Sequence, residues 1–248
     1  MSLIITIHTN EGIIMASDSR TTFNRQDFNP LPDGKGAIIT DFQGIHYSDT
    51  TYKTFLAPNS SGISTCGVAS INGKPIAGYI EDFIHNHINS NTKVSDIPDK
   101  IMSEFRKFTP IPDVIFHIAG YELLDNLPVQ KFYRVFVNVE EIVEIDVDSQ
   151  GAAWNGETEI LSRLVSEYWT ESKSEEGIPA YNKHVAPPIP WNFFSLQDAV
   201  DFAMYAMKTT IETMRFQERL KTVGGPIDIL AIKPSGAIWI ARKELHAN

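Results

Sequence analysis

Residues 2–18 read SLIITIHTNEGIIMASD, and this stretch decides the fold. Residues 2–9 alternate and are rich in Ile and Thr, residues 10–12 (Asn-Glu-Gly) are typical of a tight turn, and residues 13–17 are apolar again. The pattern predicts a β-hairpin at the start of the domain. Ser2, at the head of this stretch, is therefore expected on a strand.

The elements that follow the hairpin are predicted from turn residues and apolar periodicity. Residues 23–51 carry Asn, Pro, Asp and Gly around a short apolar run, which indicates a long loop or an added hairpin. Residues 62–68 are expected to form a strand. Helical spacing of apolar residues predicts two consecutive helices, at 74–88 and at 97–108, with Ser95 as the cap candidate of the second.

The second half of the chain also mixes strand and helix patterns. Strands are predicted at 113–119, 131–139, 141–147, 227–232 and 237–241. Helices are predicted at 157–169 and at 195–216, the latter capped by Ser195 with Asp198 three residues on. Between them, residues 170–194 are polar, Pro-rich and too long for a routine connector, so we expect a functional segment or an oligomer contact.

The order of the elements predicts the fold class. It runs strands, two helices, strands, two helices, strands, which fits neither strict βαβ alternation nor an all-β chain. Two antiparallel sheets with a helix pair outside each would bury every apolar face. We therefore expect an α+β protein, a four-layer α-β-β-α sandwich, in one domain over residues 1–248 with insertions near 23–51 and 170–194.

Composition and charge exclude several classes of function. The formal net charge of −10 would repel a phosphate backbone or an anionic bilayer, so neither nucleic acid nor a membrane is expected as a partner. The single cysteine, Cys66, excludes an intrachain disulfide and a Cys-rich zinc site, and no metal or other cofactor is expected. No signal peptide and no apolar run of roughly 20 residues is found. We expect a cytoplasmic protein that begins at its translated start.

Ser2 combines two groups that nucleophilic catalysis needs. Methionine is efficiently trimmed before a small residue, so removal of Met1 would place the hydroxyl and a free α-amino group on one residue. That amine has a reference pKa of about 7.7–8.0, near the optimum for a general base. Met-Ser is also a common start, so these two residues alone are weak evidence.

The residues around Ser2 resemble a known family. Residues 11–22 (EGIIMASDSRTT) and 51–67 (TYKTFLAPNSSGISTCG) resemble the opening of proteasome β-type subunits, including the bacterial two-component, HslV-like protease subunits. These proteins are N-terminal nucleophile hydrolases. In that family an acid follows the nucleophile by sixteen positions, as Asp18 follows Ser2 here.

Further positions extend the resemblance along the chain. In the family a catalytic lysine lies fourteen residues before the oxyanion-hole glycine, and Lys53 and Gly67 keep that interval. Arg20 and Thr22 match the Arg and Thr that follow the acid. Near the C-terminus, residues 224–229 (GGPIDI) resemble the family's glycine pair and final strands.

The resemblance implies a role for each matched residue. The Lys53 ammonium would lower the pKa of groups near Ser2, and Asp18 would hold that ammonium in place. The Gly67 amide would stabilise the oxyanion. Thr22 would offer backbone groups to an extended peptide. The alternative interpretation of the acid and the lysine is a surface ion pair.

The chain departs from the family's pattern near the nucleophile. Glu157 follows Gly156 where the family has a serine, and its carboxylate would accept a hydrogen bond from the terminal amine while raising the pKa of that amine. Leu220 and Val223 occupy the positions of an acid and a serine, and Thr222 is a candidate to replace part of that support. Reduced or altered activity is therefore a real alternative.

The expected function is that of a proteasome-type endopeptidase. Ser2 would attack a peptide bond with its own α-amine as base, and the substrate-binding candidates are Arg20, Thr22 and Glu157. The resemblance implies a peptide or unfolded-protein substrate and a symmetric homo-oligomer such as a ring, and it leaves an ATPase partner open. Two rival functions remain: a catalytically silent structural subunit, and an amidohydrolase of the same fold that acts on a small amide.

Overall fold

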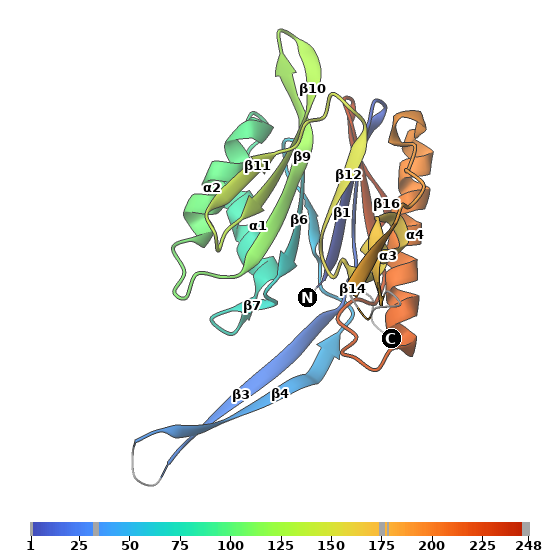
Figure 1. Cartoon of the computed structure of the whole chain (residues 1–248). Helices are drawn as coiled ribbons and strands as arrows, with labels where there is room; N and C mark the ends of the chain where they lie inside the picture. Colours follow the sequence, from blue (N-terminus) through green and yellow to red (C-terminus); the bar gives the residue numbers. More distant parts are fainter. Residues whose placement is uncertain (1, 32–34, 174–176, 178, 245–248) are drawn as a thin grey trace.

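The computed structural model describes residues 2–31, 35–173, 177 and 179–244. Two large antiparallel sheets dominate this part of the chain (Figure 1). The strand order of the first sheet is β12 (Gly151–Gly156), β1 (Leu3–Thr9), β2 (Gly12–Ser17), β15 (Asp228–Lys233) and β16 (Gly236–Ala241). The strand order of the second sheet is β11 (Glu141–Glu144), β10 (Leu127–Phe136), β9 (Val114–Leu124), β6 (Gly62–Gly67) and β5 (Thr54–Leu56).

A pair of helices covers the outer face of each sheet (Figure 1). The helical elements are α1 (Ile76–His87), α2 (Ile97–Phe105), α3 (Glu159–Val165), α4 (Leu196–Phe216) and the 3-10 turns η1 (Val94–Asp96) and η2 (Trp191–Phe193). On the second sheet, Phe105 of α2 stands edge-on to Phe116 of β9 with ring centroids 4.8 Å apart. On the first sheet, α4 buries small residues such as Ala199 and Ala203 against β1 and β2, which allows close packing.

The hairpin β1–β2 lies at the centre of the structure. Every residue of both strands is buried. Ile14 belongs to the apolar cluster under the helices, whereas Ile13 and Met15 belong to a second cluster with Phe132 of β10 in the opposite sheet. Both faces of the hairpin are therefore covered, which explains its nearly continuous apolar sequence.

Several predicted elements are confirmed. The opening hairpin forms as expected, and the helix at 195–216 begins with a capping box, in which the Ser195 hydroxyl accepts from the Asp198 amide and the Asp198 carboxylate accepts from Ser195. The expected mixture of antiparallel sheets and helices is also observed.

Other predicted elements are wrong. The helix expected over 157–169 covers only Glu159–Val165, because the chain is extended from Ser166 and continues as β13 (Tyr168–Lys173). Ser95 does not cap α2; its hydroxyl donates to Glu122, 2.9 Å away, and Asp96 occupies the N-cap position without a side-chain bond. Strand β12 was not predicted, since its sequence, GAAWNG, lacks an alternating apolar pattern.

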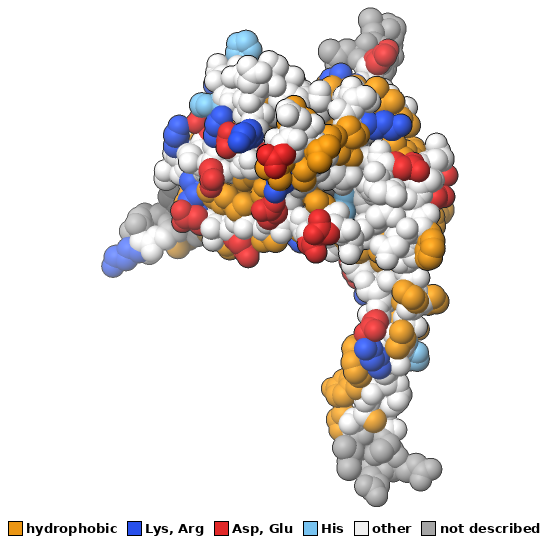
Figure 2. Space-filling view, turned by 90° about the horizontal axis from the view of Figure 1, so that it is seen from above, with side chains coloured by type: hydrophobic (Ala, Val, Ile, Leu, Met, Phe, Trp, Pro, Cys, Tyr) orange, Lys and Arg blue, Asp and Glu red, His pale blue; other side chains and the backbone are white. Residues whose placement is uncertain are grey.

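Two hairpins project from the body of the molecule. β3 (Thr21–Pro30) and β4 (Ala37–Ser48) form the long arm at the bottom of Figure 1, while residues 32–34 lie outside the described residues. β13 pairs with β14 (Pro179–His184) within the Pro-rich segment, of which 174–176 and 178 lie outside the described residues. Figure 2 shows hydrophobic side chains along this second arm, and Trp169 and Tyr181 are 61% and 65% exposed. A short ribbon of β7 (Ser70–Ile71) and β8 (Lys74–Pro75) leads into α1.

Among the described residues, no helix has both the length and the apolar character that a bilayer crossing requires. The same residues contain no group of three or more His, Cys, Asp and Glu side chains arranged to hold a metal ion.

A buried histidine links the two sheets. His117 of β9 has no exposed surface, and its Nε2 lies 2.9 Å from the Asn155 side-chain oxygen, which also accepts from Arg134. Because that oxygen only accepts, Nε2 donates, and Nδ1 accepts from the Thr6 hydroxyl 2.9 Å away. Burial lowers the pKa of His117 to about 3, so the imidazole is neutral at pH 7.

We expect His117 to make the fold acid-sensitive. Its pKa is lower in the folded protein than in the unfolded chain, so the unfolded state binds more protons between about pH 6.5 and pH 3, and stability falls with pH in that window. The loss from this group amounts to roughly 5 kcal/mol at most. Urea unfolding at pH 7, 6, 5 and 4 should show a shallower decline for His117→Gln than for the parent, while the exposed His85→Gln keeps the parental slope. Equal slopes for all three proteins would contradict the assignment.

Candidate active site

The backbone of Ser2 is held by residues at the end of β12. Ser2 is 7% exposed, and its carbonyl oxygen accepts the Glu157 amide at 2.7 Å, just beyond the end of β12. Gly156 has φ of +96°, and a Cβ there would lie 1.8 Å from the Ser2 carbonyl oxygen. The sequence needs glycine at this position because any side chain would displace the first strand.

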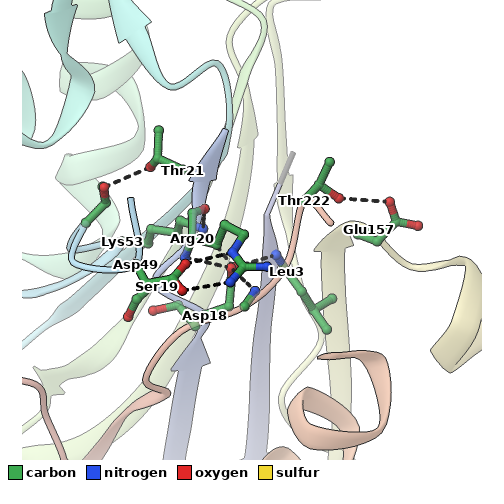
Figure 3. A network of polar contacts seen from close by, with 12 residues as sticks. Leu3, Asp18, Ser19, Arg20, Thr21, Asp49, Lys53, Glu157 and Thr222 are labelled. Carbon is green, nitrogen blue, oxygen red and sulfur yellow. Dashed lines mark hydrogen bonds and ion pairs between the residues drawn. The ribbon is translucent and has the colours of Figure 1, made fainter. Parts of the chain in front are cut away.

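The carboxylate of Asp18 collects four hydrogen bonds (Figure 3). Oδ1 accepts from the Leu3 amide at 3.0 Å and from Lys53 Nζ at 2.8 Å. Oδ2 accepts from the Arg20 and Gly224 amides, each at 3.0 Å. Asp18 is fully buried, so this residue ties together the first strand, the lysine and the turn before β15.

Lys53 is held between two acceptors. Its side chain is 5% exposed, and Nζ donates both to Asp18 and to the Arg20 carbonyl oxygen. Burial lowers the pKa of the Lys53 ammonium below its usual value, and the Asp18 carboxylate opposes that shift. The acid and the lysine therefore form a buried pair, and the surface ion pair that the sequence left open does not exist.

One small cavity brings four of the predicted residues together. Ser2, Lys53 and Gly67 all line it, and so does Thr22 of β3. Gly67 has φ of +120°, and a Cβ would lie 2.2 Å from the Asp113 carbonyl oxygen, so only glycine fits. Asp18 is connected to this cavity through its hydrogen bond with Lys53 Nζ, which lines it.

A larger cavity, of about 540 Å³, lies elsewhere, next to Trp239 and Arg242. It contains none of the residues that the sequence singled out. We therefore place the candidate active site at the smaller cavity, because the potential nucleophile Ser2 and the cationic side chain of Lys53 both line it.

Arg20 does not line the cavity beside Ser2. Its guanidinium donates to both carboxylate oxygens of Asp49, each at 2.7 Å, and lies 4.6 Å from the ring centroid of Tyr47. A Cβ on Gly224 would lie 2.5 Å from its guanidinium carbon. The Arg20 side chain thus connects the base of the β3–β4 arm, through Asp49, with the turn at Gly224, whose amide donates to Asp18.

The charge of Glu157 is also paired. Its carboxylate is 5% exposed and accepts from Arg219 at 2.6 Å and from the Thr222 hydroxyl at 3.3 Å. Thr222 therefore supports Glu157, in the region where the resemblance expects an acid and a serine. Of the two departing residues, Val223 packs in the core and Leu220 is 36% exposed.

Two other side chains of reactive types, Cys66 and His8, are buried. Burial raises the pKa of the Cys66 thiol to about 12, so it remains protonated and is a poor nucleophile at neutral pH. His8 lies on the Ser2 face of β1 but packs near Phe132, with ring centroids 6.1 Å apart, and burial lowers its pKa. Neither side chain competes with Ser2 for the role of nucleophile or base.

Sequence reasoning missed two partners of the site, Asp49 and Arg219. They lie 29 and 62 positions from the residues they pair with, Arg20 and Glu157, and no local pattern connects them. Only the tertiary fold reveals these contacts.

Comparison with known proteins supports a fold but no sequence family. No profile of a known protein family matches the chain, and no curated protein matches it by sequence. Among solved structures, Anbu from Hyphomicrobium sp. strain MC1 matches 98% of this chain and 88% of its own with a TM-score of 0.55 and 12% identity. Anbu from Yersinia bercovieri, described as an ancestral beta-subunit, matches 96% of this chain and 86% of its own with a TM-score of 0.56 and 14% identity. The chain therefore has a proteasome-like fold.

We expect Asp18→Ala to lower the free energy of unfolding by roughly 3–5 kcal/mol, because it leaves the Lys53 ammonium buried without its counter-charge. Adding Lys53→Met should recover part of that loss, since no unpaired charge then remains. The control is Glu104→Ala, which breaks a more exposed pair with Lys107 and should cost at most about 1 kcal/mol. Urea unfolding measures all four proteins. A cost for Asp18→Ala no larger than the control's would refute the buried-pair interpretation.

Proposed function

We propose that this chain is a divergent proteasome-like N-terminal nucleophile hydrolase, an endopeptidase in which Ser2 attacks the peptide carbonyl. The observation that carries the proposal is the cavity that Ser2, Lys53 and Gly67 share. The likeness to Anbu supports it at the level of the fold. The proposal includes the four-layer α-β-β-α arrangement of that class in one domain.

The reaction begins with a free terminal amine. Met1 lies outside the described residues, and its removal is part of the proposal. The amine of Ser2 takes the proton of the hydroxyl while the oxygen bonds to the substrate carbonyl carbon. The C–N bond then breaks, the departing amine receives that proton, and an ester on Ser2 remains. Water, deprotonated by the same amine, hydrolyses the ester.

The neighbours of Ser2 have distinct tasks. The Lys53 ammonium favours the developing negative charge, and Asp18 keeps that ammonium charged and oriented at 2.8 Å. The Gly67 amide, on the cavity wall, would receive the oxyanion. These groups occupy fixed positions before substrate arrives, which is the condition for electrostatic stabilisation.

The substrate would extend along β3. Within the described residues, β4 is the sheet neighbour of β3, and an extended peptide can pair with the opposite edge next to Thr22. Arg20 and Glu157 are engaged in ion pairs, so we assign them to positioning the site.

Assembly into a symmetric homo-oligomer belongs to the same proposal. Exposed Tyr168, Trp169, Tyr181 and Val185 on and beside the β13–β14 arm supply an apolar surface of the kind that subunit contacts bury. A cytoplasmic location and a peptide or unfolded-protein substrate, with or without an ATPase partner, complete it.

The silent structural subunit stays as a second candidate, because Glu157 and Arg219 form an ion pair in the region where the resemblance places a supporting serine. Its prediction differs from ours in one measurable property, which is the reactivity of Ser2.

We expect the untagged protein to lose Met1 and to form a stoichiometric adduct at Ser2 with a peptide epoxyketone or a β-lactone, because both react with a free N-terminal nucleophile. Intact-mass measurement detects both events. Ser2→Ala should abolish the adduct, whereas Ser2→Thr, which retains a hydroxyl and an amine, should keep it. Retention of Met1, or a free Ser2 that never reacts in a folded protein, would favour the structural subunit.

A further inference from the structure

The larger cavity, of about 540 Å³, lies between the open edges of the two sheets. β5 is the last strand of the second sheet, β16 is the last strand of the first, and residues in or next to both strands line the cavity together with residues of α1. Its volume falls within the roughly 300–1,000 Å³ that small-molecule sites occupy. It shares no lining residue with the cavity beside Ser2, so it is separate from the candidate active site.

The β16 side of the cavity supplies an exposed guanidinium without a counter-charge. The guanidinium carbon of Arg242 lies over two aromatic rings, 4.7 Å from the ring centroid of Trp239 and 5.4 Å from that of Tyr52. Within the described part of the chain, no carboxylate forms an ion pair with Arg242. A guanidinium stacked on a ring keeps its in-plane N–H groups available, and these match a planar carboxylate with two parallel hydrogen bonds.

The α1 side of the cavity supplies the opposite charge. Glu81 and His85 lie one turn apart on α1, and both are exposed and line the cavity. Among the residues that the structure describes, Glu81 has no ion-pair partner. Its carboxylate can accept hydrogen bonds from an ammonium group, and the His85 ring adds a further polar group beside it.

Apolar residues lie between the two charges. Phe55 of β5 and Ala57 in the turn after it are 7% and 3% exposed, and Pro58 and Ile84 extend the apolar lining. An aliphatic side chain of a ligand would be removed from water on this surface, which is favourable.

The packing of the elements sets the distance between the charges. α1 covers the outer face of the sheet that contains β5, whereas β16 belongs to the opposite sheet (Figure 1). Elements packed face to face lie about 10 Å apart, so the α1 and β16 backbones stand roughly 20 Å apart on either side of β5. Glu81 and Arg242 both reach into the space between them. An extended tripeptide, about 10 Å long, suits the gap that remains between the two side chains.

We propose that this cavity binds a short unblocked peptide of two or three residues, with its ammonium group at Glu81, its carboxylate at Arg242 and an apolar side chain against Phe55. Both charges of such a peptide are then paired, and its apolar group lies on the apolar part of the lining. The inference goes beyond the proposed function, because it does not require Ser2 to be a nucleophile.

The test uses the tripeptide Ala-Leu-Ala in three forms: unblocked, N-acetylated and C-terminally amidated. Calorimetric titration of the Ser2→Ala protein measures the three dissociation constants without cleavage of the peptide. The unblocked form should bind with a Kd of about 100 µM or below, and each block should weaken binding about tenfold, because each removes one charge-assisted contact. Free leucine is too short to join both sides and should bind at least about tenfold more weakly than the tripeptide.

Two variants, made in the same Ser2→Ala protein, assign the ends of the peptide. In Arg242→Gln the unblocked and amidated forms should bind equally, while the acetylated form still binds more weakly; Glu81→Gln should show the reverse. Arg215→Gln is the matched control, because Arg215 is also exposed and lies 5.5 Å from the ring centroid of Phe216 but does not line the cavity. It should keep all parental ratios. Because the three replaced side chains are exposed, the unfolding temperatures should stay near the parental value.

Several results would overturn the inference. They are the absence of binding at about 1 mM peptide, equal affinity for blocked and unblocked peptides, equal affinity for leucine and the tripeptide, and unchanged ratios in Arg242→Gln or Glu81→Gln. None of them depends on the reactivity of Ser2. Failure of this site therefore leaves the proposed function standing, and a Ser2 that never reacts leaves this site standing.

Discussion

The buried carboxylate of Asp18 is the interaction on which the rest of the site depends. Its two oxygens accept from the Leu3, Arg20 and Gly224 amides and from Lys53 Nζ, so one side chain joins three separate points of the backbone to the ammonium that lines the Ser2 cavity. Burial of two opposite charges is costly, and it is tolerated here because hydrogen bonds satisfy both oxygens of the carboxylate. The position of the first strand, and with it Ser2, follows from this arrangement.

Several charged side chains surround Ser2, and the predicted ones are held in ion pairs. Asp18 pairs with Lys53, and ion pairs likewise neutralise Arg20 and Glu157. The electric field at the site therefore comes from oriented ion pairs, and these pairs carry no large excess of positive or negative charge. For the proposed reaction, such a site suits a neutral amide bond better than an ionic substrate, because its paired charges would favour charge that develops in the transition state without binding charge that is already present.

The sequence predicts this structure where local patterns carry the information, and fails where contacts are distant. The alternation of residues 2–17 and the capping box at Ser195 are local, and both elements form as predicted. Strand β12 exists because β1 pairs with it, although its own residues favour no strand. In the site, the resemblance to the proteasome family selected Asp18 and Lys53, and the structure pairs them, whereas Arg219 could be found only from its contact with Glu157.

The bonds around Ser2 also determine when the site can exist during synthesis of the chain. The Ser2 carbonyl oxygen can accept its hydrogen bond only after Glu157 has been synthesised. The Asp18 carboxylate gains its bond from the Gly224 amide only after another stretch of synthesis, because Gly224 lies 206 residues after Asp18. A ribosome that has released the first 200 residues has therefore made Ser2, Lys53 and Gly67 without the Gly224 amide that completes the contacts of Asp18. Such long-range contacts are late events in folding. A nascent or truncated chain consequently carries an incomplete set of these contacts, and the chain order itself delays assembly of the candidate site until folding is nearly complete.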